Sequence, residues 1–398
     1  MPEQALSAPT SGTPFADLLD PVPVEEFLRR HRDREFLLVD RDEPDRYAGL
    51  LDLETVERFV FEGNPRKRHL QVLREGGGVD HSEYLYPSGL VDTVAVARLF
   101  AEGCSVVLPQ AQEHLVSLGV LVRGLEAELG CRVQANVYLA PPSTSAFAPH
   151  YDQHDVFAVQ VHGAKDWTLF DGDVPIPAPR PFDRVNDRAG AEVAAFTLRQ
   201  GSVCYIPRGR MHKALSDSVS VHVTVGVHWV TALDLLEATV QHAAQVVPSL
   251  QQALPHRWFE SGEAQADALA ALRSVLPGLV SDEEASAVLQ GLHHDLVATR
   301  QPLVPGQLEQ VLRIDEIDQG TVVARRDPML WRRVDGDDTV EVACFGNVIS
   351  FPAIVGVALS VLLTGADVCV GDLPGLDEEE RLVLVRRLVR EGVLQARW

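Results

Sequence analysis

Cysteine is scarce in this chain, and the few cysteines present are scattered. There are five, at Cys104, Cys131, Cys204, Cys344 and Cys369. None belongs to a Cys-x-x-Cys pair, which argues against a structural zinc site. An odd, dispersed set also argues against a disulfide framework. We therefore expect buried thiols in a reducing compartment, and we predict a cytoplasmic protein.

Long apolar runs are also missing. We find no stretch long and apolar enough to cross a bilayer, so we expect no membrane association. The first residues, Met1–Ala5, lack the basic and apolar regions of a secretory signal. Residues 1–18 are polar and carry Pro, Ser, Thr and Gly, which predicts a loose leader.

Positive charge is in deficit. The 398 residues include 35 Lys and Arg against 57 Asp and Glu, a formal net charge of -22. This disfavours nucleic-acid binding, which needs a basic surface. It suits a basic protein or peptide partner, although the same charge also serves solubility alone. The length predicts two or three domains.

Short β-strands dominate the middle of the chain. Alternating apolar residues and Gly or Pro turns predict strands at 132–139, 157–161, 166–170, 195–198, 202–206 and 220–227. Many short strands favour a sandwich or barrel, and a jelly roll fits because it protects the strand edges. Beyond residue 230 the apolar spacing becomes helical, and a terminal helix followed by a short strand is typical of a winged-helix end.

The candidate chemistry centres on two residues at the start of a predicted strand. His150 and Asp152 are two apart, so both side chains can point to one face. A third metal ligand must come from elsewhere, and His212, after Tyr-Ile-Pro-Arg-Gly, is the best candidate. Two His and one carboxylate are the ligand set of non-haem Fe(II) oxygenases, which keep coordination positions open.

Other histidines compete for roles near this site. His154 lies two residues past Asp152 and is either a further ligand or a residue on the substrate side or the surface. His222 and His228 lie on a strongly alternating strand, where each points toward the site or is a hydrogen-bonded core histidine. His162 is at a turn, where we expect exposure.

A dicarboxylate co-substrate would need a buried cation. Lys165 follows a turn at the start of a predicted strand, and if it points inward it needs an anionic partner. The alternative is a turn lysine in water. Asn136 and Tyr138 share one face of the preceding strand, where they either line the pocket as hydrogen-bond donors or pack in the core.

Taken together, these motifs resemble a known family. Pro149-His-Tyr-Asp-x-x-Asp-Val-Phe-x-x-Gln-Val-x-Gly-x-Lys-x-Trp, followed by Tyr-Ile-Pro-Arg-Gly-x-x-His-x-Ala, is similar to the JmjC-type ribosomal oxygenases, the cupin-like ribosomal protein hydroxylases. The matching core runs from about residue 131 to 230. Departures occur at Gln153 and His154, where an acidic residue is common, and at Arg210 and Met211, where an aromatic is common. We expect them near the pocket mouth, where they would affect substrate identity.

The resemblance implies an α+β fold of three parts. They are a double-stranded β-helix (jelly roll or cupin) JmjC core with an N-terminal α/β extension over residues 1–232, a helical dimerisation domain over 233–318, and a winged-helix domain over 319–398. The helical block implies a homodimer.

The resemblance also implies how the site works. It implies Fe(II) held by His150, Asp152 and His212, and 2-oxoglutarate held through Lys165, with Asn136 and Tyr138 as plausible pocket residues. The sequence thus predicts a 2-oxoglutarate-dependent dioxygenase that hydroxylates a protein side chain, such as Arg or His of a ribosomal protein. Two alternatives are the same chemistry on a natural-product precursor peptide and a non-catalytic cupin-like regulator whose winged helix contacts DNA.

Overall fold

The computed structural model describes residues 13–74, 77–142, 147–172, 174–254, 256, 258–259, 262–275 and 282–398. The chain divides into two compact units, Met1–Trp229 and Val230–Trp398. The expected divisions after residues 232 and 318 stay predictions.

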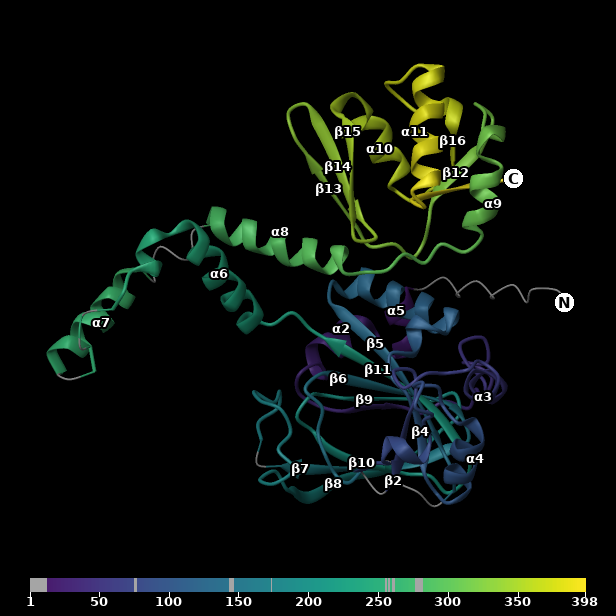
Figure 1. The fold of residues 1–398 in the computed structure, drawn as a ribbon, viewed down its shortest axis with the longest axis vertical. Coiled ribbons are helices and arrows are strands. Elements are labelled where there is room, and N and C mark those ends of the chain that lie inside the picture. Colours follow the sequence, from purple (N-terminus) through teal and green to yellow (C-terminus); the bar gives the residue numbers. More distant parts are fainter. Residues whose placement is uncertain are drawn as a thin grey trace. The chain divides into compact units, whose positions relative to one another are not determined.

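Two antiparallel sheets form the frame of the first unit (Figure 1). The larger sheet has the spatial order β1 (Leu37–Val39), β9 (Val203–Ile206), β6 (Asp155–His162), β11 (Ser220–His228), β5 (Arg132–Ala140), β4 (Ser105–Leu108), β2 (Gln71–Arg74) and β3 (Gly77–Gly78). The smaller sheet has the order β10 (Met211–Leu215), β7 (Ala164–Gly172) and β8 (Ala189–Arg199).

The larger sheet is covered on both faces. Along β6, Phe157 and Val159 pack into a core shared with the helices, whereas Val156 and Ala158 pack toward the smaller sheet and meet Trp167. Period-two alternation with both faces covered explains why β6 reads as an almost continuous apolar run. The helices of this unit are α1 (Pro14–Leu19), α2 (Val24–Arg30), α3 (Leu53–Phe61), α4 (Thr93–Ala101) and α5 (Val116–Leu129).

Register between β5 and β11 fixes which side chains face the space between the sheets. Tyr138 pairs with His222, and Asn136 pairs with Thr224. The intervening residues of both strands, such as Val137, belong to the helix-side core. Because the period is two, the paired polar side chains all point to the opposite face.

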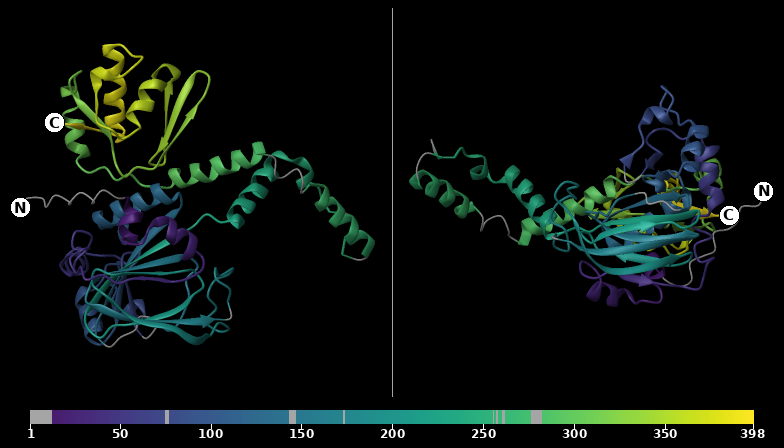
Figure 2. Two further views of the ribbon diagram at one scale, coloured as in Figure 1. Left: turned by 180° about the vertical axis from the view of Figure 1, so that it is seen from behind. Right: turned by 90° about the horizontal axis from the view of Figure 1, so that it is seen from below.

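The second unit combines helices with two small sheets (Figure 2). Its helices are α6 (Ala232–Val246), α7 (Gly262–Val275), α8 (Asp282–Ala298), α9 (Gln307–Leu312), α10 (Gly356–Leu362) and α11 (Glu378–Arg390). One sheet has the order β16 (Val368–Cys369), β12 (Val322–Arg325) and β17 (Leu394–Arg397). The other has β13 (Trp331–Asp335), β14 (Thr339–Cys344) and β15 (Asn347–Pro352). A second apolar core lies among α10, α11 and these strands.

The structure differs from the sequence pattern at three places. Part of the expected loose leader is the helix α1, whose Phe15, Leu18 and Leu19 are buried in the main core. Strand β10, which carries His212, is not predicted by the sequence pattern. Strands β13 and β15 were not expected. No helix in the described part of the chain is long and apolar enough to cross a membrane.

Candidate metal centre

Backbone hydrogen bonds bring two distant histidines side by side. The His150 N–H donates to the His212 carbonyl over 3.1 Å, and the His212 N–H donates back to the His150 carbonyl over 2.8 Å. Asp152 is held at the same place, because the Gly209 N–H donates to its backbone carbonyl over 3.0 Å. Gly209 has φ +93°, and a Cβ there would lie 2.8 Å from the backbone nitrogen of Ala178. Glycine is therefore required at this turn.

The side chains of His150, Asp152 and His212 converge. One potential ligand atom from each lies within 4.8 Å of the others. The His212 Nε2 is 3.6 Å from the Asp152 Oδ2. The remaining ring nitrogens are occupied: His150 Nδ1 lies 3.0 Å from the Ala148 carbonyl, and His212 Nδ1 lies 2.9 Å from the Arg210 carbonyl. A carbonyl only accepts, so each Nδ1 carries the proton and each Nε2 offers a lone pair to a metal.

Electrostatics favour the ligand forms of these groups. Burial, together with the neighbouring His150, lowers the pKa of His212 to about 4. Burial by itself would raise the pKa of Asp152, but His212, His154 and His150 outweigh it and the pKa is lowered. At neutral pH a neutral imidazole therefore faces a carboxylate. A divalent metal needs these protonation states, so it would not have to displace protons.

A cavity of about 580 Å³, which includes its opening to solvent, adjoins the three residues. Lys165 lines it and is 3% exposed. Its ammonium has no hydrogen bond or ion pair with the described residues, and Nζ lies 5.9 Å from the centre of the Tyr138 ring. Burial lowers the pKa of Lys165 to about 7. A buried, unpaired ammonium is costly, so this cavity is suited to an anion.

Asn136 and Tyr138 also line the cavity. The Gln110 N–H donates to Asn136 Oδ1 over 2.9 Å, which leaves the amide nitrogen to donate. Tyr138 stacks on His222, with ring centres 4.7 Å apart and planes 11° apart. Burial raises the pKa of Tyr138, so its hydroxyl stays a neutral donor.

The remaining histidines divide between two settings. His154 lines the metal cavity and lies 3.3 Å from Gln134 Nε2, and it is not among the three converging ligands. His222 also lines the cavity. The expectation of a hydrogen-bonded core histidine is wrong for His222, since its Nδ1 is buried without a partner among the described residues. His228 Nε2 is likewise without a partner there. His162 is the last residue of β6 and is half-buried, so the expectation of an exposed turn residue is wrong.

Asp155 is a site residue to which the sequence pattern assigns no role. It is 0% exposed, and its carboxylate accepts from Tyr205 Oη over 2.7 Å, from Trp229 Nε1 over 2.7 Å and from the Arg208 N–H over 3.0 Å. These bonds join the start of β6 to the turn that contains Gly209. The signal available in the sequence was a carboxylate immediately before an apolar strand, where burial demands partners.

Two of the sequence departures lie away from the cavity. Arg210 forms an ion pair with Asp171 at 2.9 Å, and Met211 is buried. Neither lines the metal cavity or the groove beside it. The expectation that Arg210 and Met211 stand at the pocket mouth is therefore wrong, and of the departing residues His154 is the one that reaches the metal cavity.

Comparison with known proteins agrees with this architecture. Residues 119–235 match the JmjC domain family model. Ribosomal oxygenase 1 of Gallus gallus is 32% identical over 272 residues, which are 65% of this chain and 45% of that protein. The bifunctional lysine-specific demethylase and histidyl-hydroxylase NO66 of Aedes aegypti is 30% identical over 238 residues, 58% of this chain and 37% of that protein. The chain thus spans less than half the length of these relatives.

Solved structures agree as well. YcfD, a ribosomal oxygenase from Escherichia coli solved with cobalt and 2-oxoglutarate, is similar with a TM-score of 0.54 and 14% identity, covering 95% of this chain and 99% of that one. Residues 119–235 thus match a JmjC domain, and the chain shares with YcfD a cupin-like fold of helices and antiparallel sheets. The predicted α+β class and jelly-roll core are confirmed.

Proposed function

We propose that this chain is an Fe(II)- and 2-oxoglutarate-dependent oxygenase that hydroxylates a side chain of a protein. The convergence of His150, Asp152 and His212 beside a cavity that buries an unpaired lysine carries this proposal. Two neutral imidazoles and one carboxylate fit Fe(II) and leave coordination positions open. Relatives named as ribosomal oxygenase and histidyl-hydroxylase support the same class.

The residues of the chain would bind the iron and 2-oxoglutarate and orient them. His150, Asp152 and His212 would hold the iron, which supplies the redox chemistry that couples 2-oxoglutarate decarboxylation to insertion of one oxygen atom into a C–H bond. Lys165 pairs with the distal carboxylate of 2-oxoglutarate. Burial limits water around that pair, which strengthens it.

Tyr138 and Asn136 complete the co-substrate pocket. Their hydroxyl and amide N–H groups are available donors, and His222 supports the Tyr138 ring through stacking. The stacked pair fixes the hydroxyl direction without adding a second charge beside Lys165, because burial and Lys165 keep the pKa of His222 well below its usual value.

The substrate we propose is an Arg or His side chain of a ribosomal protein. The names of the relatives support this choice, and the acidic net charge suits a basic partner. The test is to incubate a total ribosomal protein fraction with the chain, Fe(II) and 2-oxoglutarate, and to find peptides that gain one oxygen atom by mass spectrometry. A gain that persists with the His212→Ala variant would come from another source.

We also propose that α6–α8 mediate a homodimer and that the C-terminal part is a winged helix. Exposed apolar residues on α6, including Leu233, Leu236 and Val240, support the first proposal. The packing of α10 and α11 with the strands of the second unit supports the other. Sedimentation of the full chain and of a Leu233→Glu, Leu236→Glu variant tests the dimer. Five free cysteines, four of them buried, support a cytoplasmic setting.

A further inference from the structure

A groove of about 1070 Å³ adjoins the metal cavity, and the two share Tyr138, Phe147, His150 and Asp152. A side chain that enters the metal cavity from this groove would leave the flanking residues of its polypeptide in the groove. The charges of the groove therefore act on the substrate next to the reacting residue.

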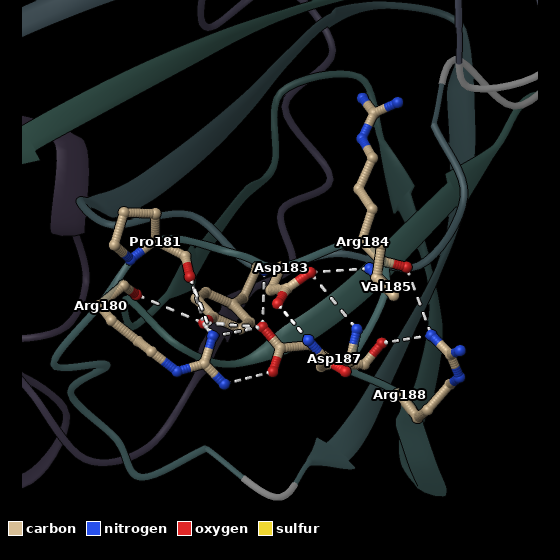
Figure 3. A network of polar contacts seen from close by, with 9 residues as sticks. Arg180, Pro181, Asp183, Arg184, Val185, Asp187 and Arg188 are labelled. Atoms are coloured by element: carbon tan, nitrogen blue, oxygen red, sulfur yellow. Dashed lines mark hydrogen bonds and ion pairs between the residues drawn. The ribbon is translucent and has the colours of Figure 1, made fainter.

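The available charge of the groove is positive, although the chain is acidic as a whole. Asp152 belongs to the metal triad, and Asp187 is neutralised by Arg180, whose Nη2 lies 2.5 Å from Oδ1. Arg184 and Arg188 remain. The Arg184 guanidinium makes no hydrogen bond or ion pair with a residue that the structure describes, and Figure 3 shows it pointing away from the neighbouring network. Arg188 donates to the carbonyls of Arg184 and Asp187, over 3.3 and 3.2 Å.

A buried clasp holds these two arginines in place. The carboxylate of Asp187 accepts from Arg180, from Tyr151 Oη over 3.1 Å and from the Asp183 N–H over 2.7 Å (Figure 3). Tyr151 lies between two metal-binding residues in sequence, and the Phe182 ring packs edge-on against it at 5.3 Å. The loop 180–188 is thus tied to the segment 150–152 of the metal triad, which reduces the entropy lost when the loop binds a partner.

We propose that Arg184 and Arg188 form a rim that selects a polypeptide with an Asp or Glu carboxylate close to the residue entering the metal cavity. This inference rests on the proposed oxygenase function and narrows its substrate class. The net charge of -22 favours a partner that is basic overall. A basic protein with a carboxylate beside its target residue is attracted by the negative net charge of the chain. Its carboxylate is attracted by Arg184 and Arg188.

The test uses the full chain loaded with Mn(II) and 2-oxoglutarate, and measures binding of fluorescent peptides by anisotropy. Two sets are needed, centred on histidine and on arginine, and the peptides within a set differ only in flanking residues: all aspartate, all asparagine or all lysine. In at least one set the aspartate peptide should bind about fivefold more tightly than the asparagine peptide, the scale expected for exposed charge pairs. Raising the salt concentration to roughly 0.5 M should reduce this difference in affinity, because salt screens exposed charges.

Arg184→Glu should abolish the preference for the aspartate peptide, because the new carboxylate offsets the charge of Arg188. The matched control is Arg98→Glu on α4, which removes an exposed cation that lines neither cavity nor groove and should keep the wild-type ranking. Equal affinity for aspartate and asparagine peptides in both sets, or a ranking that survives Arg184→Glu, would overturn the rim. Binding of 2-oxoglutarate is measured by calorimetry on the same samples, so failure of the oxygenase proposal is seen separately.

Discussion

His150 and His212 exchange two backbone hydrogen bonds, at 3.1 and 2.8 Å, and this one bridge places their imidazoles 4.6 Å apart. The bridge pairs His150, which lies outside the regular strands, with His212 of β10. The positions of the candidate metal ligands are therefore set by backbone hydrogen bonds and do not depend on the ligand side chains. The centre should therefore tolerate changes to one ligand without loss of the fold.

The first prediction concerns metal binding. His212→Ala and Asp152→Ala should each abolish Mn(II) or Co(II) binding at micromolar metal while the circular dichroism spectrum stays that of the wild type, because the ligands are lost but the backbone bridge remains. His162→Ala is the control, since this histidine lies at the end of β6, outside the triad. Metal binding that survives both ligand changes would place the site elsewhere.

The second prediction concerns the stability cost of Lys165. Its pKa of about 7 lies below the value of about 10.5 expected in the unfolded chain. The unfolded state therefore binds more protons between these values, and the free energy of unfolding rises with pH across this window. Lys165→Met removes a buried, unpaired ammonium and should stabilise the ligand-free protein by about 2–4 kcal/mol at pH 7, with the gain shrinking toward pH 10.

Urea unfolding of the two proteins at several pH values measures this difference. The same variant should lose 2-oxoglutarate binding. A variant that is less stable than wild type at pH 7 would mean that Lys165 has an anionic partner that offsets its burial.

The third prediction is proton uptake on co-substrate binding. Lys165 has a pKa of about 7 in the ligand-free protein, and the dianion binds its ammonium form. Affinity should fall by about tenfold per pH unit above pH 8, with uptake approaching one proton. Calorimetry in buffers of different ionisation enthalpy measures the uptake. Lys165→Arg keeps a permanent charge, so its affinity should be lower but flat with pH. Identical pH profiles for the two proteins would contradict the assignment.

The fourth prediction concerns Asp155, which accepts from Tyr205, Trp229 and the Arg208 N–H. Asp155→Asn replaces one acceptor oxygen by a donor and leaves buried groups unsatisfied, which should cost about 3 kcal/mol. Asp42→Asn, at an exposed position, should change stability by less than about 0.5 kcal/mol. Denaturant unfolding compares the two, and equal losses would show that the network contributes nothing specific.

The fifth prediction concerns the loop 180–188. Asp187→Asn cannot accept both Arg180 nitrogens, so the loop should open more often and trypsin should cleave after Arg184 roughly tenfold faster. Asp171→Asn, which breaks the separate ion pair with Arg210, is the control and should leave this cleavage rate unchanged. Unaltered cleavage in Asp187→Asn would show that the clasp does not restrain the loop.

Part of this site could be predicted from the sequence, because alternate residues of a strand point to the same face of the sheet. His150 and Asp152 are two apart, and the turn before Lys165 placed it at the start of a strand, so both expectations used local geometry. Strand β10 could not be foreseen, because Met211 to Leu215 shows little alternation and pairs with the distant strand β7.

The same limit explains two other differences. Helix α1 is only six residues long. It is stable because Phe15, Leu18 and Leu19 are buried by tertiary packing. The net charge does not predict the positive charge of the groove, because it sums over the whole chain. Its sign depends on Arg180 having neutralised Asp187, and that pairing is visible only in three dimensions.

The most direct test of the proposed function is an anaerobic calorimetric titration of 2-oxoglutarate into the full chain with and without Fe(II). We expect binding that needs Fe(II), with one site per chain, and that disappears in His212→Ala. Binding of equal strength without metal, or unchanged in His212→Ala, would contradict the role of the His150, Asp152 and His212 triad, and so would an absence of binding in the iron-loaded wild-type protein.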